Sequence, residues 1–184
     1  MKPLPGIPKN FRELVEADLR RAARLIIKCQ DTIDWQFRVA TPKGDYHLAV
    51  TMPDDQMQRT KMLLRIEAFM QWRAATAFTL AAETTVPLDG RDTSPDALYV
   101  IGVSKRGDLI NCLVPITRNP RPWSEANFGS VAWLPQDNID AVLIELLVAS
   151  PRTMTPRLVQ ALEYWFGASG LFPAVQLPSG EATM

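Results

Sequence analysis

Apolar residues recur at intervals of three and four positions from Phe11 to Cys29, which is the spacing of a helix with one buried face. Acidic residues come early in this stretch and basic residues late, as the helix dipole favours. Asn10 directly precedes the pattern, and its side chain is suited to cap the first turn. The pattern therefore predicts an N-terminal helix from Phe11 to Cys29.

Two pairs of short segments have the pattern of β-hairpins. Residues 35–39 and 46–51 alternate apolar with polar positions around the turn Thr41–Asp45, which predicts a hairpin with one apolar face. Residues 98–103 and 109–114 are apolar at nearly every position and are joined by a turn at residues 104–108. Because strands buried on both faces have such continuous apolar runs, we expect the second hairpin to lie nearer the centre of the sheet.

Between the two hairpins, a helical pattern begins at Asp54 and extends to about Glu83, with Asp54 and Asp55 as candidate caps. A helix of this length would be about 45 Å long, which exceeds what a single small domain needs. We therefore expect it either to kink or to pack its far end against something else, such as a second subunit. Residues 84–95 contain Pro, Gly, Asp and Ser and are predicted to form a loop.

The C-terminal third of the chain predicts two shorter helices. One begins at Asp137 or Asn138, and the other begins at Thr155–Pro156 and ends near Gly167 or Gly170. A short strand is predicted at Val131–Leu134. The remaining residues carry no sustained apolar pattern.

These elements predict a single α+β domain over residues 1–172 and a flexible C-terminal tail over residues 173–184. The domain is expected to hold a four-stranded, mainly antiparallel sheet made of the two β-hairpins. The long central helix, the N-terminal helix and the two C-terminal helices are expected to pack against it. Because the second hairpin needs cover on both faces, either the C-terminal helices or a partner subunit must supply it, and a homodimer built on the long helix is predicted.

The two hairpin turns have similar sequences. Lys43-Gly44-Asp45 and Arg106-Gly107-Asp108 each lie in a hairpin that follows a helical pattern. An internal duplication would account for this resemblance. Convergent turn chemistry accounts for it equally well, because such turns favour Gly beside Asp.

The charge balance and the length of the apolar stretches argue against some classes of function. The chain has 184 residues, with 20 Lys and Arg against 20 Asp and Glu, and this balance argues against binding to nucleic acid or to an anionic membrane surface. The apolar stretch Ala74–Ala82 is about half the length that would span a bilayer, and no signal-peptide pattern opens the chain. A cytoplasmic protein with two free core thiols, Cys29 and Cys112, is expected.

The sequence carries no motif for a cofactor or metal. One His and two Cys fall short of the four ligands of a structural zinc site, and neither glycine-rich phosphate-binding motif occurs. We therefore predict no metal and no cofactor.

His47 is the one residue whose ordinary pKa suits a general base near neutral pH. The alternation places it on the face opposite Tyr46 and Leu48, together with Gln36 and Arg38. If that face is open to water, His47 is a surface histidine. If a helix or a second subunit covers that face, a paired polar cluster becomes possible.

These observations leave two classes of function. The first is a non-catalytic binding or regulatory module that self-associates and binds a protein or a small molecule, and it is favoured because no catalytic constellation is assembled. The alternative is a small enzyme that uses His47 with Glu83 or Asp96 beside the 84–95 loop.

A stripe of basic residues along the N-terminal helix could bind a ligand. Arg20, Arg24 and Lys28 are spaced four apart and could follow phosphate groups. The other interpretation is that these residues lie on a solvent-exposed face of the helix, with their positive charges toward the C-terminal end, where the helix dipole favours cations.

Overall fold

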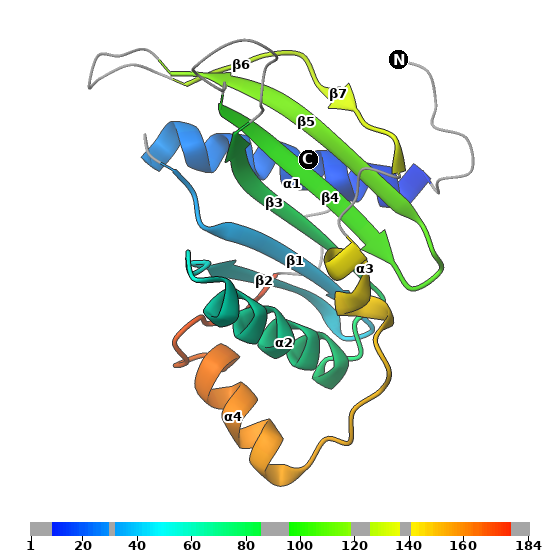
Figure 1. Cartoon of the computed structure of the whole chain (residues 1–184). Helices are drawn as coiled ribbons and strands as arrows, with labels where there is room; N and C mark the ends of the chain where they lie inside the picture. Colours follow the sequence, from blue (N-terminus) through cyan, green and yellow to red (C-terminus); the bar gives the residue numbers. More distant parts are fainter. Residues whose placement is uncertain (1–8, 30–31, 86–95, 119–125, 137–140, 178–184) are drawn as a thin grey trace.

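The structure is a computed structural model that describes residues 9–29, 32–85, 96–118, 126–136 and 141–177. Figure 1 shows the helices α1 (Lys9–Cys29), α2 (Gln56–Trp72), α3 (Ala141–Val148) and α4 (Pro156–Phe166). The strands are β1 (Trp35–Thr41), β2 (Gly44–Val50), β3 (Ala77–Thr85), β4 (Asp96–Ser104), β5 (Leu109–Thr117), β6 (Asn127–Phe128), β7 (Ala132–Trp133) and β8 (Val175–Gln176).

The strands form one antiparallel sheet in the order β6-β5-β4-β3-β1-β2-β8, and β7 also pairs with β5. The predicted α+β class with an antiparallel sheet is confirmed, as are both hairpins, β1–β2 and β4–β5. The predicted number of four strands is wrong, because the described residues form an eight-stranded sheet. The short strand predicted at Val131–Leu134 is confirmed as β7, whereas β6 and β8 have only two residues each, which is too short for an alternating pattern to show.

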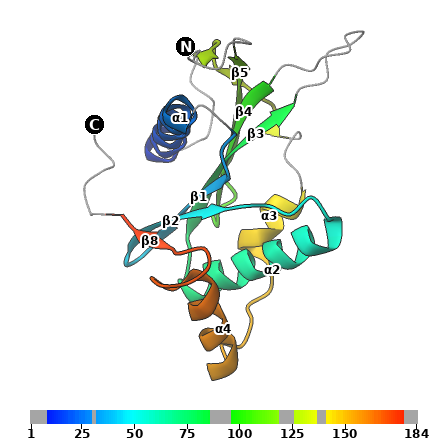
Figure 2. The same ribbon diagram turned by 90° about the vertical axis from the view of Figure 1, so that its left-hand side faces the viewer.

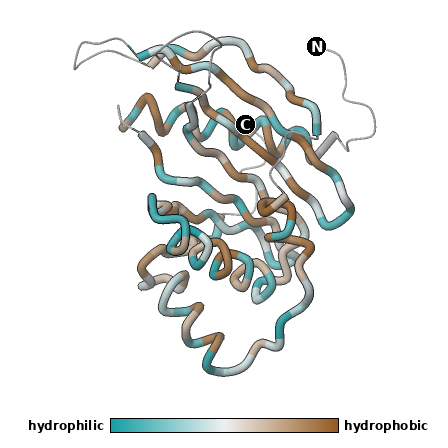
Figure 3. Tube along the Cα trace, in the orientation of Figure 1, coloured by the Kyte–Doolittle hydropathy of each residue, from teal (hydrophilic) through white to brown (hydrophobic). Residues whose placement is uncertain are grey.

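Helices lie on both faces of this sheet. Figure 2 shows α1 on one side and α2, α3 and α4 on the other. The buried face of α1 packs its apolar side chains against β3 and β4, while the larger core cluster lies between the sheet and the other three helices. Figure 3 shows apolar residues concentrated along the central strands and in α3. Helices of this chain therefore lie against both faces of β4.

The long helix predicted from Asp54 to Glu83 is wrong in its second half. Asp55 does cap α2, by accepting a hydrogen bond from the backbone N–H of Gln58 at 2.8 Å. The helix then ends at Trp72, and Ala74 adopts a left-handed φ of 54°. The N–H groups of Ala74 and Ala75 close the helix by donating to the carbonyls of Gln71 and Met70.

The run that follows, Ala77–Ala82, is a central strand and not a helix segment. All six residues are buried, and they face alternately toward α1 and toward α2. A strand buried on both faces and a buried helix have the same continuous apolar run, so this stretch was ambiguous in the sequence. The homodimer was predicted to form on the long helix, which ends at Trp72, while α1 and α3 contact β4 of the second hairpin; self-association stays a prediction.

The predictions for the C-terminal helices, the two cysteines and the C-terminal tail are confirmed in part. The cap at Thr155 and the end of α4 at Gly167 are confirmed, whereas Asp137 and Asn138 lie outside the described residues. Cys112 is buried as expected, but Cys29 is exposed, because the last turn of α1 leaves it outside the core. Within the predicted tail, Val175 and Gln176 pair with β2. No helix among the described residues is long and apolar enough to cross a membrane.

Candidate functional site

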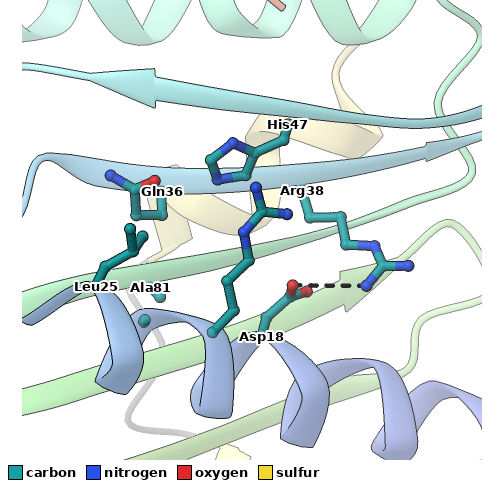
Figure 4. Close-up of a pocket in the computed structure, with 8 residues that line it drawn as sticks. Asp18, Leu25, Gln36, Arg38, His47 and Ala81 are labelled. Carbon is teal, nitrogen blue, oxygen red and sulfur yellow. Dashed lines mark ion pairs between the residues drawn. The ribbon is translucent and has the colours of Figure 1, made fainter. Parts of the chain in front are cut away.

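Polar side chains from α1, β1 and β2 meet between the helix and the sheet. Figure 4 shows Asp18 on α1 facing Arg38 on β1, with His47 of β2 and Gln36 nearby. Arg21 of α1 lines the same cavity. We call these five residues the His47 cluster. Of the two sequence-based alternatives for this face, the structure shows the one in which a helix covers it.

Buried ion pairs hold this cluster together. The Arg38 guanidinium lies 2.7 Å from a carboxylate oxygen of Asp45 and 3.6 Å from one of Asp18. The hydroxyl of Thr79 on β3 donates a hydrogen bond to the other Asp18 oxygen. Burial raises the pKa of Asp18, although the bond from Thr79 and the charge of Arg38 act in the opposite direction. These contacts join α1 to β1 and β3 through Asp18, and Arg38 in turn joins β1 to β2 through Asp45.

His47 lies on the covered face with one ring nitrogen unpaired among the described residues. Its Nε2 atom is buried and has no hydrogen-bond partner among the described residues. Burial, together with the positive charges of Arg21 and Arg38, lowers the pKa of His47 to about 4. The adjoining cavity has a volume of about 10 Å³, which is roughly the space of one water molecule. The ring is therefore neutral at neutral pH, and this cavity does not accommodate a substrate.

The other two catalytic candidates lie together at a different place. Arg118 pairs with the carboxylates of both Glu83 and Asp96, and Glu83 also accepts a hydrogen bond from the backbone N–H of Ile33. Thr79 of β3 contacts the His47 cluster through its hydrogen bond to Asp18. Glu83 lies four residues further along the same strand, and four residues of an extended strand span about 13 Å. The structure thus brings Glu83 and Asp96 together but does not bring either to His47. Residues 86–95 of the predicted loop lie outside the described residues.

The basic stripe lies on the outer side of α1. Arg20, Arg24 and Lys28 are all exposed, whereas Asp18 and Arg21 line the cavity beside the sheet. The three cations therefore share one solvated helix face and do not contribute to the His47 cluster.

A larger concavity lies on the other side of the sheet, between the C-terminal end of α2, the β4–β5 turn and the end of α3. Its volume is about 500 Å³, within the range of small-molecule sites. We call it the groove. It is lined by Gln71, Ala74, Lys105, Leu147, Val148, Ala149, Pro151, Arg152 and Met154.

Specific hydrogen bonds fix the walls of the groove. The Gln71 amide donates to the carbonyl of Ser150 and accepts from the backbone N–H of Arg152, so α2 holds the segment that follows α3. The Arg152 Nε atom donates to the buried carboxylate of Glu67 at 2.9 Å. On the opposite wall, the backbone N–H of Lys105 donates to the carbonyl of Thr76. The concavity is therefore formed by anchored segments.

Sequence reasoning did not find the groove, because its residues come from three segments far apart in the chain. Leu147 and Met154 have the pattern of ordinary core residues. Ala74 lay inside the predicted long helix, whose true end forms one wall. The exposure of Val148, at 55%, is a property of the packed structure that the apolar pattern of α3 does not indicate.

Neither site has the donor set of a metal centre. The described residues contain no group of three His, Cys, Asp or Glu side chains placed to hold a metal ion. Burial and the charge of Glu16 raise the pKa of the Cys112 thiol to about 12, so this buried thiol is protonated at neutral pH. Comparison of the chain with protein-family models, with curated proteins and with solved structures finds no significant match.

Proposed function

We propose that the protein is a non-catalytic binding module that holds a small molecule in the groove. The observation that carries this proposal is the groove itself, with a volume of about 500 Å³ and a mainly apolar lining. Binding sites for small molecules combine an apolar surface with a few fixed polar groups, and the anchored segments around Gln71 supply that combination.

The chemistry of the lining favours binding over catalysis. The nine lining residues include no carboxylate, imidazole, hydroxyl or thiol side chain that could act as a general base or nucleophile. Lys105 is exposed, and none of the other lining residues is an acidic or basic side chain placed to exchange a proton with it.

A small enzyme centred on His47 is the second candidate. The observation in its favour is the buried Nε2 atom without a hydrogen-bond partner. The substitution His47→Ala separates the two candidates, because it should silence an enzyme of this kind and leave binding in the groove intact.

The proposal is tested by a fragment screen in which ligand-observed NMR detects binding to the full chain. Two variants place an indole in the last turn of a helix, Val148→Trp in the groove and Ile27→Trp on α1 as the matched control. Both native side chains are partly exposed, at 55% and 46%, so each larger ring can be accommodated. Light scattering and thermal unfolding check that both variants keep the size and fold of the parent protein.

We expect fragments that bind the parent protein and Ile27→Trp to lose binding to Val148→Trp. If no fragment binds the parent protein and loses that binding in Val148→Trp, the proposed function is wrong. If every fragment that binds is instead lost in His47→Ala, the site lies at the His47 cluster and the enzyme candidate is favoured.

A further inference from the structure

We infer that the groove selects an apolar small molecule that carries one anionic group, such as a medium-chain carboxylate. This inference rests on the proposed function and specifies the class of ligand. The polar atoms around the groove that still lack partners indicate which ligand the groove would select.

The amide oxygen of Gln71, a side-chain acceptor in the lining of the groove, is in use. The Gln71 amide oxygen accepts from the backbone N–H of Arg152. The Glu67 carboxylate behind the wall is buried, and one of its oxygens accepts from both Gln71 and Arg152. The lining adds no other side-chain acceptor of comparable strength, since its remaining members are Ala, Leu, Val, Pro, Met and Lys.

The unused polar groups are cationic donors. Among the described residues, the Lys105 ammonium has no ion pair or side-chain hydrogen bond. Arg152 engages Glu67 through Nε, which leaves its two terminal nitrogens for a further partner. A ligand that satisfies these donors must present an acceptor, and an anionic acceptor forms the stronger bonds.

The end of α2 does not cancel this positive charge. A helix C-terminus carries partial negative charge on its free carbonyls. Here the carbonyls of Phe69, Met70 and Gln71 accept from the N–H groups of Arg73, Ala75 and Ala74. Among the charged side chains of the lining and the wall behind it, Lys105 and Arg152 therefore stand against the single carboxylate of Glu67.

Size selects a small molecule over a peptide as the occupant. The volume of about 500 Å³ matches a compact ligand, and the apolar surface of Leu147, Val148 and Met154 suits an alkyl chain. The expected pose places the chain along these side chains and the carboxylate between Lys105 and Arg152.

The test compares decanoate with decanol, which share an alkyl chain and differ in the charged group. Binding of each probe to the full-length protein is measured by NMR titration at low ionic strength. The variant Lys105→Met removes the cation from the groove. The variant Arg106→Met removes the same charge from the neighbouring position of the same exposed turn, which is not part of the lining.

We expect decanoate to bind about tenfold or more tightly than decanol, which corresponds to about 1.4 kcal/mol. Lys105→Met should remove most of this preference, and Arg106→Met should retain it. Added salt should weaken decanoate binding more than decanol binding.

Other outcomes overturn the inference, and those that concern the two alkyl probes leave the proposed function intact. Equal affinity for the two probes, or equal effects of the two variants, would show that the groove does not recognise the anionic group. Binding of an acidic peptide in the absence of decanoate binding would identify a protein partner instead. Failure of the proposed function has a different signature, because then no fragment is displaced by Val148→Trp.

Discussion

Arg38 and His47 lie directly opposite each other on β1 and β2, and both side chains are covered by α1. The guanidinium has two carboxylate partners, whereas the imidazole has no hydrogen-bond partner for Nε2 among the described residues. A proton on His47 would therefore add a second positive charge beside Arg38, with Arg21 contributing a third from the helix. This arrangement makes the contact between α1 and the sheet sensitive to acid.

The first prediction concerns pH. The pKa of His47 is about 4 in the folded protein and about 6.5 in the unfolded chain, so the unfolded chain binds the proton more readily. The corresponding stability is present above pH 6.5 and is lost as the pH falls toward 4. After discounting for partial exposure, we expect the loss to be about 1–2 kcal/mol. Urea unfolding at a series of pH values measures it.

The control for this pH dependence is His47→Gln, which keeps a polar side chain but cannot titrate. Its stability should change less between pH 6.5 and 4. The raised pKa of Asp18 favours proton uptake by the folded protein and so opposes the effect of His47, and it is present in both proteins. Identical pH profiles for the two proteins would contradict the role assigned to His47.

The second prediction concerns the buried ion pairs. Arg38→Met removes the ion-pair partner of Asp18 and leaves that carboxylate buried with the bond from Thr79 and the more distant charge of Arg21. We expect a loss of about 3–5 kcal/mol in the free energy of unfolding. Arg24→Met removes an exposed cation of α1 and should change stability by less than about 0.5 kcal/mol. Adding Asp18→Asn to Arg38→Met should recover part of the loss, and a further decrease would contradict the account.

The third prediction concerns the end of α2. Ala74 has a left-handed φ of 54°, a conformation that glycine adopts without strain. Ala74→Gly should therefore increase stability, by up to about 1 kcal/mol. Ala161→Gly in the exposed middle of α4 should decrease it by about 1 kcal/mol. Thermal unfolding of the two variants should show shifts of opposite sign, and a destabilised Ala74→Gly protein would refute this interpretation of the turn.

The fourth prediction concerns the close packing of α1 against Gly102 of β4. A Cβ atom on Gly102 would lie 2.6 Å from a methyl carbon of Val15 and 3.0 Å from the ring of Phe11. Both side chains are buried, so Gly102→Ala should cost about 1–3 kcal/mol. In a double-mutant cycle, Val15→Ala should be less destabilising in the Gly102→Ala protein than in the parent. Additive effects would show that the methyl group is accommodated elsewhere.

Strict alternation identified the strands of the first hairpin, and capping residues identified the beginnings of α2 and α4. The end of α2 could not be predicted, because Ala74 stands at the left-handed position where Gly is the usual signal. Without that signal, the apolar run of β3 extends the helical pattern. Strands of two residues, such as β8, depend on tertiary pairing and leave no periodic signal.

For the candidate sites too, the local sequence pattern predicted which residues share a face, but not how the elements pack together. Alternation correctly placed Arg38 and His47 on one face of the hairpin. It could not show that α1 covers that face, or that Asp18 is buried beneath the helix. The groove depends on how three separate segments pack, and each segment alone has the pattern of core or turn.

The central claim is that the groove binds an apolar small molecule that carries one anionic group, and the most direct test is an NMR titration of the isotopically labelled protein with decanoate. We expect saturable shifts in backbone amides concentrated around Gln71, Lys105 and Ala149, which line the groove from its three segments. Shifts concentrated around His47, or weak shifts spread over the surface without saturation, would contradict the claim.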